Sequence, residues 1–296
     1  GNVIATAYLQ GTGLGPQATF LPGKESSVDS GNLSFPEGVV ADGNGNIYIA
    51  DTYHNRVLKE TLSAGGYTES VVPTSALTIP EWVSVDGGGN LYITDTGNNR
   101  VLKETLSAGG FTESVLPTST LSAPFSAPVD GSGNVYIADY SNNRVLKETL
   151  SGGTYTESTV TISDLNGPEA VAVDAIGNLY VVDDSNRLIK ETYSAGSYTE
   201  SVVSTSSLAQ PYGVTVDGIG NVYITDSGNG RILKETPASG STYTESTVPT
   251  SSLSVPIETA VDAGGNVFIA DLSNNRVLKE DFADPPSLSF AATAVG

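Results

Sequence analysis

The stretch that decides the fold reads Pro-Glu-Gly-Val-Val-Ala-Asp-Gly-Asn-Gly-Asn-Ile-Tyr-Ile-Ala-Asp and runs from Pro36 to Asp51. Close copies of it recur along the 296-residue chain. Its two aspartates recur every 43 to 45 residues, the first as Asp42, Asp86, Asp130, Asp174, Asp217 and Asp262, and the second as Asp51, Asp95, Asp139, Asp183, Asp226 and Asp271. Six copies of one structural unit are therefore present.

Each copy predicts four short β-strands, which in the first copy are residues 39–42, 47–50, 56–61 and 67–72. The Gly-Asn-Gly-Asn sequence that follows the first strand accepts positive φ and predicts a tight hairpin turn. The second strand is continuously apolar, as expected of a strand covered on both faces. Four strands in each repeat, with no helical periodicity, predict an all-β fold, a six-bladed β-propeller with four-stranded antiparallel blades.

The two ends of the repeat array predict how the ring closes. The sixth copy ends at Lys279-Glu280 and has no outer strand after it, whereas residues 23–28 align with the outer strand 67–72 of the first copy. We therefore expect an N-terminal outer strand to complete the last blade, with one strand from the N-terminus and three from the C-terminus. The propeller would span residues 23–281, between an N-terminal extension at 1–22 and a C-terminal extension at 282–296.

The repeat carries a family resemblance. Pro-Glu-Gly-Val-x-x-Asp, followed by Gly-Asn-(Val/Ile/Leu)-Tyr-(Ile/Val)-(Ala/Thr)-Asp and Asn-Arg-(Val/Ile)-Leu, resembles the NHL repeat in all six copies. Propellers of this kind serve as protein- or RNA-binding platforms and as sensor ectodomains, and related six-bladed rings include lactonases and lyases. The chain also resembles repeat domains of bacterial secreted or surface proteins, because residues 285–290 are similar to the opening strand of an immunoglobulin-like module. The resemblance implies an extracellular or cell-surface location in bacteria, with residues 1–22 ending a preceding module.

The composition excludes several classes of function. There are 13 basic and 33 acidic residues, a formal net charge of −20, and every basic residue except Lys24 is part of the repeat as one Arg and one Lys per copy. No basic patch remains for nucleic acid. The chain has no cysteine and one histidine, so it lacks the ligands of a thiolate or histidine-rich metal centre. No apolar run approaches the ~18 residues of a membrane span, so no membrane insertion is expected.

The repeated charges have structural interpretations. We expect each Arg to form a forked interaction with the aspartate that ends the second strand or with a neighbouring blade. We expect the Lys-Glu pairs of the third strand to be solvated edge charges. Twenty-four of the acids belong to the repeat pattern, and nine do not. Because a symmetric scaffold uses the same residue in every copy, residues that depart from the pattern are the better functional candidates, with sequence drift as the alternative.

The departures gather on the face where the loops into the first strand and the corners after the second strand meet. They predict a binding surface around the mouth of the central channel. Its residues are Glu37, Glu81, Trp82, Phe125, Glu169, Tyr212 and Glu258, which follow the repeat proline, with Tyr53, His54 and Tyr140 from the corners. Aromatic rings beside carboxylates suit sugar rings, cationic groups or a protein partner. Trp82 has an alternative role as a channel plug packed against neighbouring inner strands.

Three interpretations remain open, and one of them is purely architectural, a recently amplified repeat whose face has no ligand. The first is a non-catalytic binding or scaffold domain, a monomer with no cofactor, which takes a protein or carbohydrate ligand at the channel mouth. Replacing Trp82 and Tyr212 by alanine would then abolish capture and leave melting unchanged. The alternative is a calcium-dependent lactonase or lyase, because Ca²⁺ needs only oxygen ligands and the four glutamates Glu37, Glu81, Glu169 and Glu258 are expected to converge near the axis. A lone surface histidine such as His54 has no partner acid that the sequence assigns.

Overall fold

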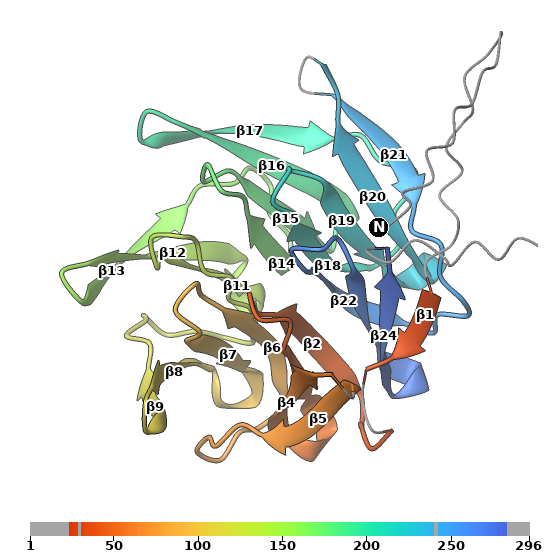
Figure 1. Cartoon of the computed structure of the whole chain (residues 1–296). Helices are drawn as coiled ribbons and strands as arrows, with labels where there is room; N and C mark the ends of the chain where they lie inside the picture. Colours follow the sequence, from red (N-terminus) through yellow and green to blue (C-terminus); the bar gives the residue numbers. More distant parts are fainter. Residues whose placement is uncertain (1–23, 29–30, 65, 240–241, 283–296) are drawn as a thin grey trace, which may run out of the picture.

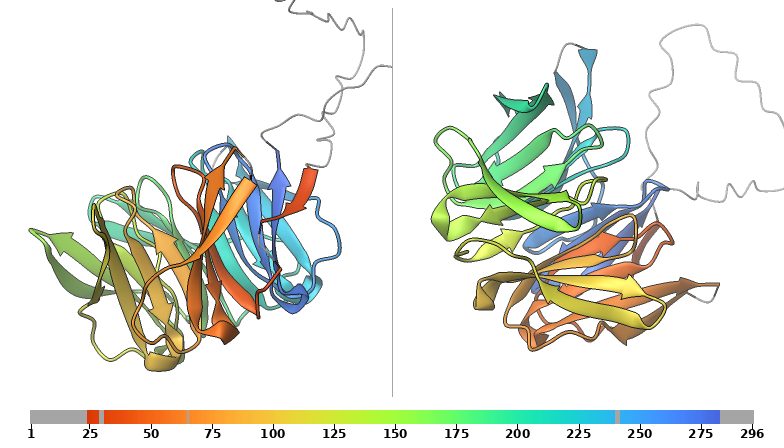
Figure 2. Two further views of the ribbon diagram at one scale, coloured as in Figure 1. Left: turned by 60° about the horizontal axis from the view of Figure 1, so that its bottom comes forward. Right: turned by 90° about the vertical axis from the view of Figure 1, so that its left-hand side faces the viewer.

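The computed structural model describes residues 24–28, 31–64, 66–239 and 242–282. They form six four-stranded antiparallel sheets arranged in a ring, with the inner strands toward the centre and the outer strands at the periphery (Figure 1). In the side views the sheets stand next to one another as sectors of a thick ring (Figure 2). The prediction of a six-bladed all-β propeller is confirmed.

In blades 1 to 5 the strands follow one another in chain order from the centre outward. Blade 1 contains β2 (Pro36–Ala41), β3 (Ile47–Asp51), β4 (Arg56–Ser63) and β5 (Gly66–Val71). Blade 2 contains β6 (Pro80–Val85), β7 (Leu91–Asp95), β8 (Arg100–Ser107) and β9 (Gly110–Val115). Blade 3 contains β10 (Pro124–Ser126), β11 (Val135–Asp139), β12 (Arg144–Ser151) and β13 (Thr154–Val160). Blade 4 contains β14 (Pro168–Val173), β15 (Leu179–Asp183), β16 (Arg187–Ser194) and β17 (Ser197–Val203). Blade 5 contains β18 (Pro211–Val216), β19 (Val222–Asp226), β20 (Arg231–Pro237) and β21 (Tyr243–Thr247).

Blade 6 combines segments from both ends of the chain. It contains β22 (Pro256–Val261), β23 (Val267–Asp271), β24 (Arg276–Asp281) and β1 (Lys24–Ser27), and β1 pairs antiparallel with β24 (Figure 1). Phe282 donates its backbone N–H to Asn266 at 3.1 Å, as Leu62 does to Asn46 in blade 1. The two proposed extensions, residues 1–22 and 282–296, otherwise lie outside the described residues, as does the resemblance at 285–290.

The polar corner after the second strand is a single 3-10 turn in five blades. These turns are η1 (Thr52–His54), η2 (Thr96–Asn98), η3 (Tyr140–Asn142), η4 (Ser227–Asn229) and η6 (Leu272–Asn274). In η1, Asn55 follows with a φ of 52° and returns the chain into the third strand. Asparagine tolerates this left-handed conformation better than most residues, which explains its recurrence at the corner.

The core lies between the blades, because each second strand is covered on both faces. All five residues of β3, β7, β11, β15, β19 and β23 are buried. Between blades 1 and 2, for example, Tyr48 and Val57 of the first blade pack with Val83, Ile93 and Leu102 of the second. The sequence expectation of a doubly covered second strand is confirmed.

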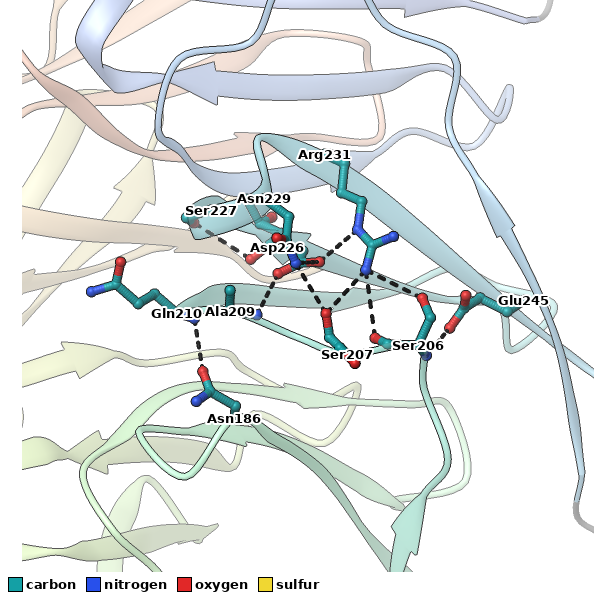
Figure 3. A network of polar contacts seen from close by, with 11 residues as sticks. Asn186, Ser206, Ser207, Ala209, Gln210, Asp226, Ser227, Asn229, Arg231 and Glu245 are labelled. Atoms are coloured by element: carbon teal, nitrogen blue, oxygen red, sulfur yellow. Dashed lines mark hydrogen bonds and ion pairs between the residues drawn. The ribbon is translucent and has the colours of Figure 1, made fainter.

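The aspartate that ends each second strand is buried and paired with the arginine that begins the third. Arg231 Nε donates to Asp226 Oδ2 at 2.6 Å, and the other oxygen, Oδ1, accepts the backbone N–H of Ala209 at 2.8 Å (Figure 3). Arg231 also donates to the carbonyl of Ser207 in the same incoming loop (Figure 3). Equivalent ion pairs are present in all six blades. The predicted fork is thus confirmed, and it fixes the loop that leads into the inner strand.

The prediction for the Lys-Glu pairs of the third strand is wrong. Glu104 is buried, next to Glu113 on the outer strand, and Lys103 Nζ lies 5.1 Å from the ring centre of Tyr92 and 5.4 Å from that of Tyr155 in the next blade. The third strand is internal in each sheet, and its inner part is covered by the neighbouring blades. The lysine and glutamate side chains of such a strand therefore lie between blades and are not solvated edge charges.

Candidate functional site at the channel mouth

A β-bulge at the start of each inner strand delivers one side chain to the channel. In blade 2, Pro80 pairs with Asp95 and Trp82 pairs with Thr94, so Glu81 between them has no partner in the ladder. The register shifts after the repeat proline in every blade. A bulge redirects the side chain of the extra residue, and the six residues that directly follow the proline are Glu37, Glu81, Phe125, Glu169, Tyr212 and Ile257.

These six side chains line one cavity of about 260 Å³ at the channel mouth. Its remaining lining residues are Trp82, Val255 and Leu272. Of the ten predicted site residues, the structure brings six to this cavity, which we call the mouth pocket: Glu37, Glu81, Trp82, Phe125, Glu169 and Tyr212. Glu258, Tyr53, His54 and Tyr140 do not line it.

The pKa values of the three carboxyl groups of the mouth pocket are all raised. Burial raises the pKa of Glu37 to about 7. Burial, and then the charge of Glu37, raise the pKa of Glu81 to about 8, against a hydrogen bond from Thr96 that lowers it. Burial raises the pKa of Glu169 to about 9, together with a hydrogen bond to Asp184 and the charges of Asp184, Glu81 and Glu37. The pocket therefore holds acids that strongly resist simultaneous ionisation.

Tyr140 lies outside the mouth pocket and packs against Phe125, one of its lining residues. Its ring stacks on Phe125 with the ring centres 4.3 Å apart, and its hydroxyl donates to Asp184 Oδ2 at 2.9 Å. That hydrogen bond, followed by burial and the charge of Asp184, raises the pKa of Tyr140 to about 12. Asp184 in turn contacts Glu169. Sequence reasoning placed Asp184, one of the nine acids outside the repeat pattern, on the candidate face as a corner residue but did not select it as a site residue.

Tyr53 and His54 lie outside the mouth pocket. Tyr53 is 58% exposed and stacks on Phe35, with ring centres 4.3 Å apart. His54 Nδ1 lies 2.8 Å from Asp51 Oδ2, in the position where an asparagine amide donates to the corner aspartate in four other blades. His54 thus does have a partner acid, and its contact is that of a structural corner residue.

Trp82 and Glu258 stand one position further along their strands than the post-proline residues, and both line a second cavity along the inner strands. Trp82 is only 7% exposed and packs with Ala170, Ala172 and Val214 from blades 4 and 5. The plug interpretation is supported, and we now expect the double change of Trp82 and Tyr212 to alanine to lower the melting temperature, because removal of a buried aromatic costs about 3–5 kcal/mol. The second cavity has a volume of about 230 Å³.

The expectation that four glutamates converge is therefore wrong for one of them, Glu258, because only Glu37, Glu81 and Glu169 line the mouth pocket. Glu258 is 3% exposed, and its Oε2 has no hydrogen-bond partner among the described residues. Burial raises its pKa well above the ordinary value. In the described part of the chain, no three acidic or histidine side chains are arranged to hold a metal ion.

The comparisons with known proteins agree with this architecture. The sequence pattern of the NHL repeat matches residues 33–59. The chain is a six-bladed β-propeller that contains an NHL repeat. No relative was found among curated protein sequences. The described helices are single 3-10 turns, and none has the length and apolarity to cross a membrane.

Similar solved structures include enzymes and a protein of a binding complex. Virginiamycin B lyase from Staphylococcus aureus has a TM-score of 0.59 at 18% identity, over 87% of each chain. A gluconolactonase from Xanthomonas campestris has a TM-score of 0.70 at 15% identity, over 87% of this chain and 89% of that one. A chain of the nidogen/laminin complex has a TM-score of 0.61 at 22% identity, over 73% of this chain and 80% of that one. At these identities the likeness establishes the fold alone.

Proposed function

We propose that this propeller is a non-catalytic binding domain that takes its ligand in the mouth pocket. The observation that carries the proposal is the convergence of the post-proline residue of every blade on a single cavity. The repeat pattern is otherwise closely kept in all six blades, whereas these positions vary among Glu, Phe, Tyr and Ile. Concave sites with apolar and aromatic walls and a few polar groups are the usual form of a ligand pocket.

The electrostatics support binding more than catalysis. A hydrolase or lyase needs a charge-stabilising group opposite its acid or base. The described lysines and arginines have their partners at the corners or between the blades. The mouth pocket offers three carboxyls and aromatic rings, a combination that binds sugars, cations or protein side chains without further chemistry.

The test is a screen of glycan and peptide arrays with three proteins: wild type, Tyr212→Ala and Ile219→Ser. Tyr212 lines the mouth pocket, whereas Ile219 is exposed in the hairpin turn that follows the opposite end of the same inner strand. We expect the screen to identify a ligand that wild type and Ile219→Ser bind and that Tyr212→Ala does not bind. The bound ligand should be recovered with unchanged mass. Retention by Tyr212→Ala would refute the site, and a chemically altered ligand would favour the enzymatic alternative.

A further inference from the structure

We propose, building on the function above, that the mouth pocket receives an alkylammonium group, carried by a free amine or by a lysine side chain of a peptide. The inference rests on three features of the described residues. These are an acid cluster without a cation of its own, aromatic residues around it, and a buried carboxyl oxygen without a hydrogen-bond partner in the second cavity.

The mouth pocket contains no positive charge from the described part of the protein. Glu37, Glu81 and Glu169 line it, and no ion pair joins them to a described lysine or arginine. The six arginines are held by the corner aspartates. Five lysines lie over tyrosine rings between blades, and Lys279 pairs with Asp281 at 2.9 Å. A ligand would have to bring the compensating charge.

The walls of the mouth pocket favour an organic cation over a metal ion. Three aromatic residues, Trp82, Phe125 and Tyr212, line the same cavity as the three carboxyls. An ammonium group is attracted to the face of an aromatic ring, most strongly when the site is desolvated. Ile257 and Leu272 add apolar surface for an alkyl stem. A hard divalent cation instead needs several oxygen ligands around one point, which the described acids do not provide.

An independent observation comes from the channel beneath the mouth pocket. Glu258 is buried and lines the second cavity, which Trp82 also lines. Its Oε2 has no hydrogen-bond partner among the described residues. Buried polar atoms are normally paired, so this unpaired oxygen beside the second cavity indicates a missing hydrogen-bond partner in the channel. An ammonium group carries three donors.

Because the charge of the acids depends on pH, the affinity of the mouth pocket for an ammonium ligand should depend on pH as well. The titratable groups in or beside the mouth pocket are Glu37, Glu81, Glu169, Asp184, Tyr140 and Tyr212. The pKa values of the three glutamates are raised to between about 7 and about 9. An ammonium ligand prefers their ionised forms and lowers these pKa values, so its binding releases protons. A primary amine keeps its proton up to pH ~10, so affinity should increase as pH rises from 6 to 9.

The experiment titrates wild type with four probes and follows the fluorescence of Trp82, the single tryptophan in the chain. The probes are n-butylammonium, its neutral counterpart 1-butanol, N-acetyl-lysine methylamide and its neutral counterpart N-acetyl-norleucine methylamide. We expect the cations to bind at least about tenfold more tightly than the neutral counterparts, a difference of ~1.4 kcal/mol. Calorimetry at pH 8 in phosphate and in Tris should show proton release. Binding of the amino-acid probe alone would assign the site to peptides, and preference for butylammonium to free amines.

The variants separate the site from general charge effects. Glu81→Gln, and the triple change of Glu37, Glu81 and Glu169 to glutamine, should reduce cation binding at least tenfold while melting is retained. Asp164→Asn also removes one charge, but from an exposed loop residue with a φ of 51°, which asparagine accepts, and it should bind as wild type does. Equal binding of cationic and neutral probes, no binding of either, or cation binding that survives Glu81→Gln would overturn the inference. Array ligands lost by Tyr212→Ala would still support the proposed function in those cases.

Discussion

The hydroxyl of Tyr140 donates a hydrogen bond to Asp184 Oδ2 at 2.9 Å and thereby joins blades 3 and 4 beside the mouth pocket. Both residues occupy the corner after the second strand, one in each blade. The contact links Phe125, on which Tyr140 stacks, to Glu169, which contacts Asp184. A pair of corner residues outside the pocket thus affects both an aromatic wall and an acid inside it.

Neutralising Asp184 should therefore change titrations in the mouth pocket. In Asp184→Asn the pKa of Glu169 should fall below about 9, because the charge of Asp184 and its hydrogen bond help to raise it. The pKa of Tyr140 should fall from about 12 for the same reason. Carbon-13 NMR of labelled glutamate and tyrosine measures both values. Asp164→Asn is the matched control, and unchanged titration of Glu169 in Asp184→Asn would contradict this coupling.

Gly38 should be required for the spacing of blades 1 and 2. A Cβ at Gly38 would lie 2.8 Å from the backbone oxygen of Glu81 and 2.9 Å from Trp82 Cα. Since backbone atoms cannot move aside as a side chain can, Gly38→Ala should lower the free energy of unfolding by about 1–3 kcal/mol. Gly43, in the hairpin turn of the same blade, has no atom within 4 Å of such a Cβ. Gly43→Ala should thus stay within about 0.5 kcal/mol of wild type in denaturant unfolding. Equal effects of the two changes would refute the argument.

His54 should be replaceable by asparagine. It contacts the corner aspartate Asp51 as an asparagine does in four other blades. His54→Asn should leave the free energy of unfolding within about 0.5 kcal/mol and the binding of array ligands intact, whereas His54→Ala should cost about 1 kcal/mol through the lost hydrogen bond. Thermal unfolding and array binding measure these effects. Loss of binding in His54→Asn would restore His54 to the site.

Much of the fold was predictable because the residues that each blade requires recur in all six copies of the repeat. The spacing of Asp42 and Asp51 in every copy revealed the blades, and the Arg that follows each corner was correctly paired with its aspartate. The post-proline residues Glu81 and Tyr212 were recognised as departures from the pattern, and the structure places both in the mouth pocket.

The errors arose where the direction of a side chain depends on packing between blades. Glu104 looked solvated because it lies between Lys103 and Thr105, yet it is buried in the folded protein. The bulge after the proline turns Glu81 to the mouth and leaves Trp82 to pack across the channel. Glu258 occupies the position of Trp82 rather than that of Glu81, so its separation from the other acids follows from a one-residue offset.

Stability should be greatest at mildly acidic pH. Burial, with the hydrogen bond to Glu113 and its charge, raises the pKa of Glu104 to about 7. Although burial raises the pKa of Glu113, hydrogen bonds from Ser75 and Glu104 hold it below the ordinary value. In the unfolded chain both titrate near pH ~4.3. The contribution of protonated Glu104 is complete below that pH and lost as pH rises through about 7, whereas that of ionised Glu113 is lost as pH falls below ~4.

The same arrangement recurs in other blades, where the pKa of Glu148, Glu191 and Glu235 is raised to about 7 and that of Glu280 to about 8. Thermal unfolding between pH 3 and pH 9 should show a maximum near pH ~5 and a decline toward pH 8. Glu104→Gln should lessen that decline and melt above wild type at pH 8. A melting temperature that increases steadily from pH 5 to pH 8 would contradict the burial of these acids.

The most direct measurement of the binding site is a crystal structure of the complex with N-acetyl-lysine methylamide at pH 8. The predicted result places the ligand ammonium within hydrogen-bond distance of at least two of Glu37, Glu81 and Glu169, with its alkyl stem against Tyr212 and Leu272. Ligand density elsewhere on the ring, with the mouth pocket unchanged, would contradict the proposed site and its chemistry together.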